Sequence, residues 1–190
     1  MKDNPIRISI IGPECSGKTT LADQLASHFD AKLVSEYART YLEQKGAPAS
    51  YEDLYQIAIG QHELENQAEK AALAKAQGSV IISDTDLQVV RIWSEIAFEK
   101  CDNRILSMLA AARRDIYLLT YPDLVWVADG QREYPDEKDR LRIFHHYLDS
   151  MVGQQSFFEI IKGQGTLRLE TAIIAINRVI SARLPHQDPA

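Results

Sequence analysis

The sequence predicts an α/β fold in which helices cover both faces of a five-stranded parallel sheet. Three observations support this class. Short runs of β-branched residues alternate with longer segments of helical spacing along most of the 190 residues. The first run ends in a glycine-rich loop that leads directly into a helical segment. The run SVIIS at 79–83 has the apolar, β-branched character of a strand that is buried on both faces.

Each element follows from its own local pattern. The predicted strands, in chain order, are 6–11, 32–34, 79–83, 116–119 and 157–161. The predicted helices are 19–26, 37–45, a long helix from 51 that ends before Gly78, 87–99, 103–113 and a last amphipathic helix through 169–180. Because strands alternate with helices, we expect βαβ units and a single domain over residues 1–190.

Composition and charge exclude several classes of function. The net charge of −6 argues against a nucleic-acid partner, because such domains usually carry a basic face. No charged-then-apolar leader and no bilayer-length apolar stretch is present, so no membrane partner is expected. The two cysteines, Cys15 and Cys101, are far apart and favour a reducing compartment, hence a cytoplasmic protein. The sequence leaves open whether the chain forms a homo-oligomer.

The most specific motif is the octapeptide at 12–19, Gly-Pro-Glu-Cys-Ser-Gly-Lys-Thr, which fits a phosphate-binding loop (P-loop) between a strand and a helix. In such a loop, backbone N–H groups surround a polyphosphate, Lys18 neutralises the β and γ oxygens, and the Thr19 hydroxyl binds Mg²⁺. The motif therefore predicts a P-loop NTPase fold with a nucleotide and Mg²⁺ as cofactors. The predicted nucleotide-binding residues are Gly12, Pro13, Glu14, Cys15, Ser16, Gly17, Lys18, Thr19 and Thr20.

Two carboxylates follow the third predicted strand, where ligands of open α/β sheets bind. We predict that Asp84 is the second metal partner beside Thr19; the alternative is that it caps the next helix. Asp86 is predicted to bind substrate hydroxyls, and its alternative is also helix capping.

An acid and a base, Glu36 and Arg39, lie three residues apart after the second strand and share one helix face. An exposed ion pair has the same spacing. The position next to the sheet edge favours an active-site role, in which Glu36 accepts a proton from an attacking hydroxyl and Arg39 orients it or contacts the phosphate.

The charge-rich stretch that begins at Trp126 predicts a mobile lid, at about 127–150, over the nucleotide. Arg132 is the first candidate to stabilise the transferring phosphoryl group, with Arg140 and Arg142 behind it. A solvated helical hairpin is the structural alternative.

Five motifs together resemble the nicotinamide riboside kinase domains of the NadR-type NAD-biosynthesis proteins. They are the loop at 12–20, Glu-Tyr-Ala-Arg at 36–39, Gly60-Gln61, Asp-Thr-Asp at 84–86 and Trp-Val-Ala-Asp-Gly-Gln-Arg at 126–132, in this order. The resemblance implies an ATP- and Mg²⁺-dependent transfer of the γ-phosphoryl group to the ribose 5′-hydroxyl of nicotinamide riboside, a small-molecule nucleoside. It also places Glu36, Arg39 and Asp86 at the nucleoside, and Trp126, Asp129 and Arg132 on the lid side.

The sequence departs from this family at Ser35, where some members carry an aromatic residue that stacks on the nicotinamide ring. Four aromatic residues are candidates to replace it: Tyr37, Tyr41, Tyr55 and Trp126. Two other functions remain open, namely a kinase for another nucleoside or nucleotide and a P-loop ATPase switch.

Overall fold

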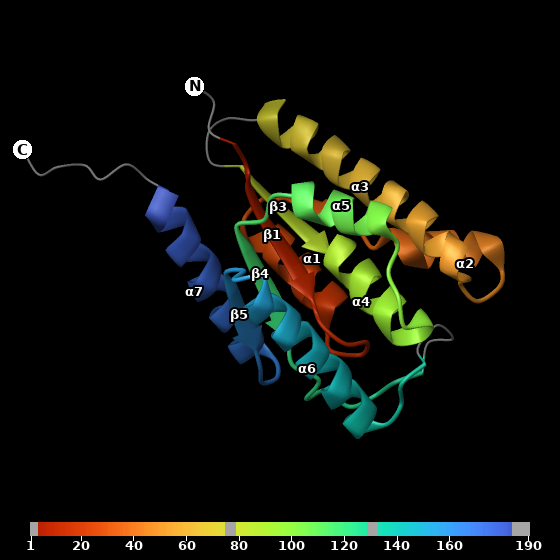
Figure 1. Ribbon diagram of the computed structural model, residues 1–190. Coiled ribbons are helices and arrows are strands. Elements are labelled where there is room, and N and C mark those ends of the chain that lie inside the picture. The colour runs from red at the N-terminus through yellow and green to blue at the C-terminus, as the bar shows by residue number, and fades with distance from the viewer. Residues whose placement is uncertain (1–3, 75–78, 129–132, 184–190) are drawn as a thin grey trace, which may run out of the picture.

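The computed structural model describes residues 4–74, 79–128 and 133–183. Its five strands form one parallel sheet in the order β2-β3-β1-β4-β5 (Figure 1). The strands are β1 (Ile6–Ile11), β2 (Lys32–Val34), β3 (Val80–Asp84), β4 (Ile116–Thr120) and β5 (Phe158–Ile161). The predicted fold class is confirmed, and no strand end differs from its predicted position by more than one residue.

Seven helices connect and follow these strands in the part of the chain that the structure describes. They are α1 (Lys18–His28), α2 (Tyr37–Lys45), α3 (Tyr51–Ala74), α4 (Leu87–Phe98), α5 (Asn103–Ala111), α6 (Glu137–Gly153) and α7 (Thr166–Arg183). None of the described helices is both long enough and apolar enough to cross a membrane.

The helices cover the two faces of the sheet in separate groups (Figure 1). On one face, buried side chains of α1 and α7 pack against β1, β3, β4 and β5. On the other face, α4 and α6 pack against β1 and β4, while α3 packs against β2 and β3. α5 packs against α3 and α4. The alternation of strands and helices in the sequence thus becomes a three-layer arrangement.

The predicted lid needs a new boundary, because much of it is a core helix. Ile143, Phe144, Tyr147 and Met151 of α6 are buried against β4 and the neighbouring elements. Burial of such side chains is the main source of fold stability. The helical part of the stretch at about 127–150 is therefore structural, and residues 129–132 lie outside the described part of the chain.

Strand order brings three functional segments to one edge of the sheet. β1 lies between β3 and β4, and the pairing register sets Ile10 beside Asp84 and Ile11 beside Leu119. The P-loop that follows β1 is therefore flanked by the carboxyl ends of both neighbouring strands, where ligands bind in open α/β sheets.

Candidate active site

The P-loop is closely supported by the end of β4. Gly12 has a φ of 138°, and a Cβ built on it would lie 2.5 Å from Thr120 Oγ1, so only glycine fits here without a shift. Thr120 Oγ1 donates to the Ile11 carbonyl oxygen at 3.0 Å. Ser16 Oγ lies 2.6 Å from both Thr120 Oγ1 and the Pro13 carbonyl oxygen. These contacts hold the loop in a curved conformation.

Lys18 begins α1 and reaches back over the loop. Its Nζ donates to the carbonyl oxygens of Gly12 at 3.1 Å and Pro13 at 2.8 Å. The ammonium group therefore lies over the loop at the amino end of a helix, where backbone N–H groups and the helix dipole also favour an anion. This is the arrangement that the sequence predicts for phosphate binding.

A buried arginine from α7 fastens the loop from behind. Arg168 Nη2 donates to the carbonyl oxygens of Ser16 at 2.6 Å and Tyr121 at 2.9 Å, while Nη1 pairs with Asp123 at 2.6 Å. Sequence reasoning did not find Arg168, because nothing in a helix 150 residues away identifies its contact with the loop.

Asp84 and Thr19 meet at the end of β3, as a Mg²⁺ site requires. The Thr19 hydroxyl lies near the Asp84 carboxyl group, and Asp84 is 4% exposed. Burial raises the pKa of Asp84, while Thr19 and the Lys18 charge oppose that shift. Asp84 Oδ1 is buried and has no hydrogen-bond partner among the residues that the structure describes. An unpartnered carboxylate oxygen beside a hydroxyl fits a hard cation.

The described residues contain no cluster of three or more histidine, cysteine, aspartate or glutamate side chains that could hold a metal by itself. A Mg²⁺ ion bound by Thr19 and Asp84 would therefore take its other ligands from phosphate oxygens and water, as this ion commonly does.

Asp86 caps α4 and belongs to an internal ion pair. Its Oδ1 accepts from the Gln88 backbone N–H at 2.9 Å, and its Oδ2 accepts from Arg114 Nε at 2.9 Å. The side chain is fully buried. The capping alternative is thus confirmed, whereas contact of Asp86 with a substrate stays a prediction.

Arg114 links Asp86 to a second buried acid beneath the site. Its Nη2 pairs with both carboxylate oxygens of Glu65, at 2.6 and 2.7 Å, and its Nε also donates to Ser9 Oγ at 2.6 Å. Burial and the nearby Asp86 charge raise the pKa of Glu65 to about 7, although Arg114 acts against this shift. The network fixes the start of α4 against β1 and α3.

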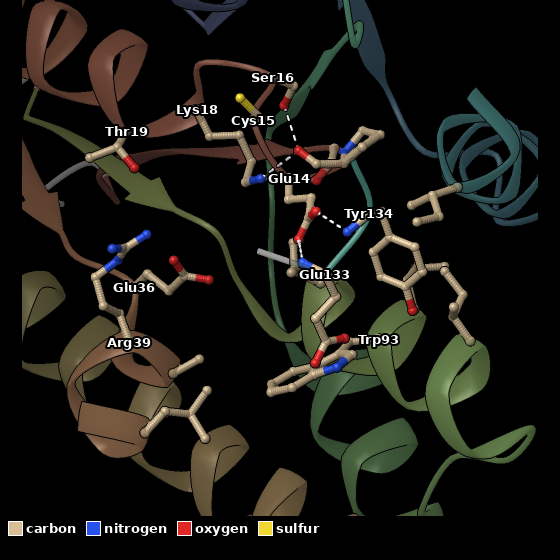
Figure 2. A pocket seen from close by; sticks show the side chains of 18 of the residues that line it. Glu14, Cys15, Ser16, Lys18, Thr19, Glu36, Arg39, Trp93, Glu133 and Tyr134 are labelled. Atoms are coloured by element: carbon tan, nitrogen blue, oxygen red, sulfur yellow. Dashed lines mark hydrogen bonds between the residues drawn. The ribbon is translucent and has the colours of Figure 1, made fainter. Parts of the chain in front are cut away.

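A cavity of about 580 Å³ opens between the P-loop, α2, α4 and α6 (Figure 2). It is lined by the whole P-loop together with Thr20, Glu36, Ala38, Arg39, Leu42, Gly46, Ala47, Pro48, Ala49, Val89, Ile92, Trp93, Ile96, Glu133, Tyr134, Ile143 and Tyr147. Among these lining residues, Lys18 and Arg39 are the basic ones, and Glu14, Glu36 and Glu133 are the acidic ones. The volume suits one small organic ligand beside a polyphosphate.

Glu36 and Arg39 enter this cavity from α2, on the side away from Glu14 and Tyr134 (Figure 2). Glu36 is the N-cap residue of α2, but its side chain does not cap the helix. Instead, Gln61 Oε1 accepts from the Tyr37 backbone N–H at 2.9 Å. Glu36 can therefore direct its carboxylate into the cavity.

Gly60 and Gln61 act together in positioning the start of α2. A Cβ on Gly60 would lie 2.1 Å from the Tyr37 ring, so glycine allows α2 to pack closely on α3. This close approach brings Gln61 within reach of the first turn of α2 and so fixes the position of Glu36.

The aromatic residues that line the cavity differ from the four candidates taken from the sequence. Trp93, Tyr134 and Tyr147 line it, whereas Tyr37, Tyr41, Tyr55 and Trp126 do not. Tyr41 donates to Asp53 at 2.7 Å, and the Tyr55 ring lies 3.7 Å from the Arg104 guanidinium. The signal for Trp93 was present, because residues 89, 92, 93 and 96 form an apolar stripe on the helix after Asp84.

The lid-side candidates fall in several places. Asp129 and Arg132 lie outside the described residues, so their roles stay predictions. Arg140 is buried and donates to the Leu124 carbonyl oxygen at 3.1 Å, and Arg142 is exposed. Neither Arg140 nor Arg142 lines the cavity.

Comparisons with known proteins agree with this fold. A family model described as "AAA domain" matches residues 7–168. A curated relative, the trifunctional NAD biosynthesis/regulator protein NadR of Salmonella typhimurium, is 28% identical over 153 residues, which cover 78% of this chain and 36% of that protein. The chain thus spans little more than a third of the length of this relative.

Two solved structures have a similar fold. A crystal structure of NadR in complex with NR superposes with a TM-score of 0.73 at 22% identity, covering 97% of this chain and 54% of that one. Thymidylate kinase from Candida albicans superposes with a TM-score of 0.63 at 18% identity, covering 93% and 94%. The fold is therefore that of P-loop kinases. The chain belongs to the AAA-domain family, and the resemblance to NadR-type proteins that its sequence predicts is confirmed.

Proposed function

We propose that this chain transfers the γ-phosphoryl group of ATP to the ribose 5′-hydroxyl of nicotinamide riboside and so forms nicotinamide mononucleotide. The observation that carries the proposal is the composition of the cavity beside the P-loop. Aromatic side chains and three carboxylates line it, and the described lining includes two basic residues, Lys18 and Arg39, of which we assign Lys18 to the polyphosphate. This surface suits a neutral or cationic nucleoside better than an anionic nucleotide.

The chemical roles follow from position. The P-loop amides and Lys18 hold the β- and γ-phosphates, while Thr19 and Asp84 would hold Mg²⁺, which neutralises developing charge on the phosphate oxygens. Glu36 accepts the proton of the 5′-hydroxyl as its oxygen bonds to the γ-phosphorus and the bond to ADP breaks. Arg39 supports the Glu36 carboxylate or the transferred group. Arg132 is proposed as the transition-state clamp on the grounds of sequence alone.

A kinase for another nucleoside or nucleotide is the second candidate, because the thymidylate kinase fold resembles this one. A nucleotide acceptor would need further cations in the cavity, and among the described lining residues the basic side chains are those of Lys18 and Arg39. An ATPase switch has no need for an aromatic cavity next to its phosphate loop.

The deciding experiment offers the protein a panel of nucleosides and nucleoside monophosphates with ATP and Mg²⁺. Release of ADP and the product mass are measured together. We expect nicotinamide riboside to give a product heavier by one phosphoryl group, with a higher kcat/KM than any other acceptor. A faster reaction with a nucleoside monophosphate would overturn the proposed acceptor, and ADP release without any phosphorylated acceptor would favour an ATPase.

A further inference from the structure

Glu14 and Lys18 both belong to the P-loop, but their side chains bond to different parts of the chain. Lys18 Nζ donates to the carbonyl oxygens of Gly12 and Pro13. Glu14 instead accepts two backbone N–H groups from a segment about 120 residues later. Its Oε2 accepts from Glu133 at 2.9 Å, and its Oε1 accepts from Tyr134 (Figure 2).

A carboxylate inside a phosphate-binding loop opposes the binding of an anion, so its presence needs a compensating interaction. Two N–H groups that converge on one carboxylate form charge-assisted hydrogen bonds, which are stronger than neutral ones. They also disperse the negative charge of Glu14. The pair of bonds therefore offsets part of the electrostatic cost of this acid in the loop.

The two residues that Glu14 holds form one wall of the cavity. The Tyr134 ring and the Glu133 carboxylate both line it, together with Trp93 of α4 (Figure 2). This wall faces Glu36 and Arg39 across the cavity. Just after it, Asp136 caps α6 by accepting from the Lys138 backbone N–H at 2.7 Å, so the segment is also held at its far end.

A neighbouring loop residue makes a second link to the same connection between β4 and α6. Cys15 Sγ lies 3.4 Å from the Val125 carbonyl oxygen and 3.3 Å from the Val127 backbone nitrogen. Adjacent P-loop residues thus contact both the beginning and the end of this connection. Glu14 is the one whose contacts carry cavity-lining side chains.

We propose that Glu14 is a positioning residue that fixes the acceptor wall formed by Glu133 and Tyr134, and so determines which acceptor the P-loop kinase takes. This inference rests on the proposed function for its kinetic consequence. It implies that the phosphate loop and the acceptor side are one connected unit. A change at Glu14 then alters acceptor binding more than nucleotide binding.

The test compares Glu14→Gln with wild type, and Glu63→Gln, an exposed change of the same charge on α3, serves as control. Glutamine keeps the size of the side chain but has one acceptor oxygen in place of two. We expect hydrogen exchange at the amides of 133 and 134 to accelerate about ten-fold, while the amides of α1 keep their exchange rates. We also expect KM for the acceptor to rise about ten-fold, with KM for ATP within about three-fold of wild type or lower.

Each outcome of these measurements supports or overturns the proposed role of Glu14. Unchanged exchange at 133 and 134 would overturn the proposal, as would equal increases of both KM values. A fall in kcat at constant KM would place Glu14 on the reacting groups instead and would also overturn it. If wild type phosphorylates no nucleoside, the proposed function fails, and the exchange measurement still decides whether Glu14 holds this wall. A thermal midpoint near that of wild type shows that the variant is folded.

Discussion

Replacing Arg114 by methionine should destabilise the fold by about 3–5 kcal/mol, because two buried carboxylates lose the cation that they share. The Arg114 side chain is 4% exposed, and so is that of Glu65, while Asp86 is fully buried. Methionine occupies a similar volume without a charge. The loss would be a large part of the roughly 5–15 kcal/mol that stabilises an ordinary domain.

Urea unfolding followed by circular dichroism measures this loss. With a denaturant slope of about 2 kcal/mol per molar, the midpoint should fall by about 2 M. Arg142→Met is the matched control, because that arginine is 72% exposed and its ion pair with Asp139 is 3.5 Å long. The control should change the free energy of unfolding by less than about 0.5 kcal/mol.

The pH dependence adds an independent check. Burial raises the pKa of Glu65 to about 7 even with Arg114 present, and removal of Arg114 takes away an interaction that lowers it. The native variant then binds a proton more tightly than the unfolded chain does, so its stability falls as pH rises through the higher folded pKa. The gap from wild type should widen between about pH 6 and about pH 8. A loss below about 1 kcal/mol, or a gap that is independent of pH, would refute this account of the network.

Three further substitutions test the proposed chemistry. Lys18→Ala should lower kcat by about 10²–10³-fold in a coupled ADP-release assay, because charge neutralisation at the phosphates is lost; near-normal turnover would contradict the role of the loop. Glu36→Gln should lower kcat by about 10²-fold or more while calorimetry finds the same ATP affinity; a change in acceptor KM alone would make Glu36 a binding residue. Asp84→Asn should raise the Mg²⁺ concentration for half-maximal activity at least about ten-fold, and an unchanged Mg²⁺ titration would remove Asp84 from the metal site.

Local patterns were sufficient for the sheet and for the phosphate loop. β1, the P-loop and α1 follow one another in the chain, so the strand, the loop and the helix each leave a readable signal in the sequence. The position of Asp84 could also be predicted from the sequence, because a residue that directly follows a buried strand lies at the edge of the sheet where ligands bind. The structure brings it to Thr19, as expected.

Contacts between segments that are distant in the sequence could not be predicted from local patterns. Arg168 and Thr120 support the loop from residues more than 100 positions away, and neither has a local pattern that marks the contact. The high charge of the stretch after Trp126 concealed α6, although the spacing of Ile143, Tyr147 and Met151 indicated a buried helix face. The helix cap at Asp86 was one of the two roles that the sequence allowed, whereas its ion pair with Arg114 could not be identified from sequence.

The central place of β1 has a consequence for how binding competence arises during folding. The P-loop comes from the first tenth of the chain, but it is held in place by β3 and β4, which pair with β1. Pairing between segments so far apart in the sequence forms slowly. A partly assembled sheet would therefore lack a usable nucleotide pocket. Nucleotide would bind only to fully folded molecules, and by mass action it would therefore shift the folding equilibrium toward the native state.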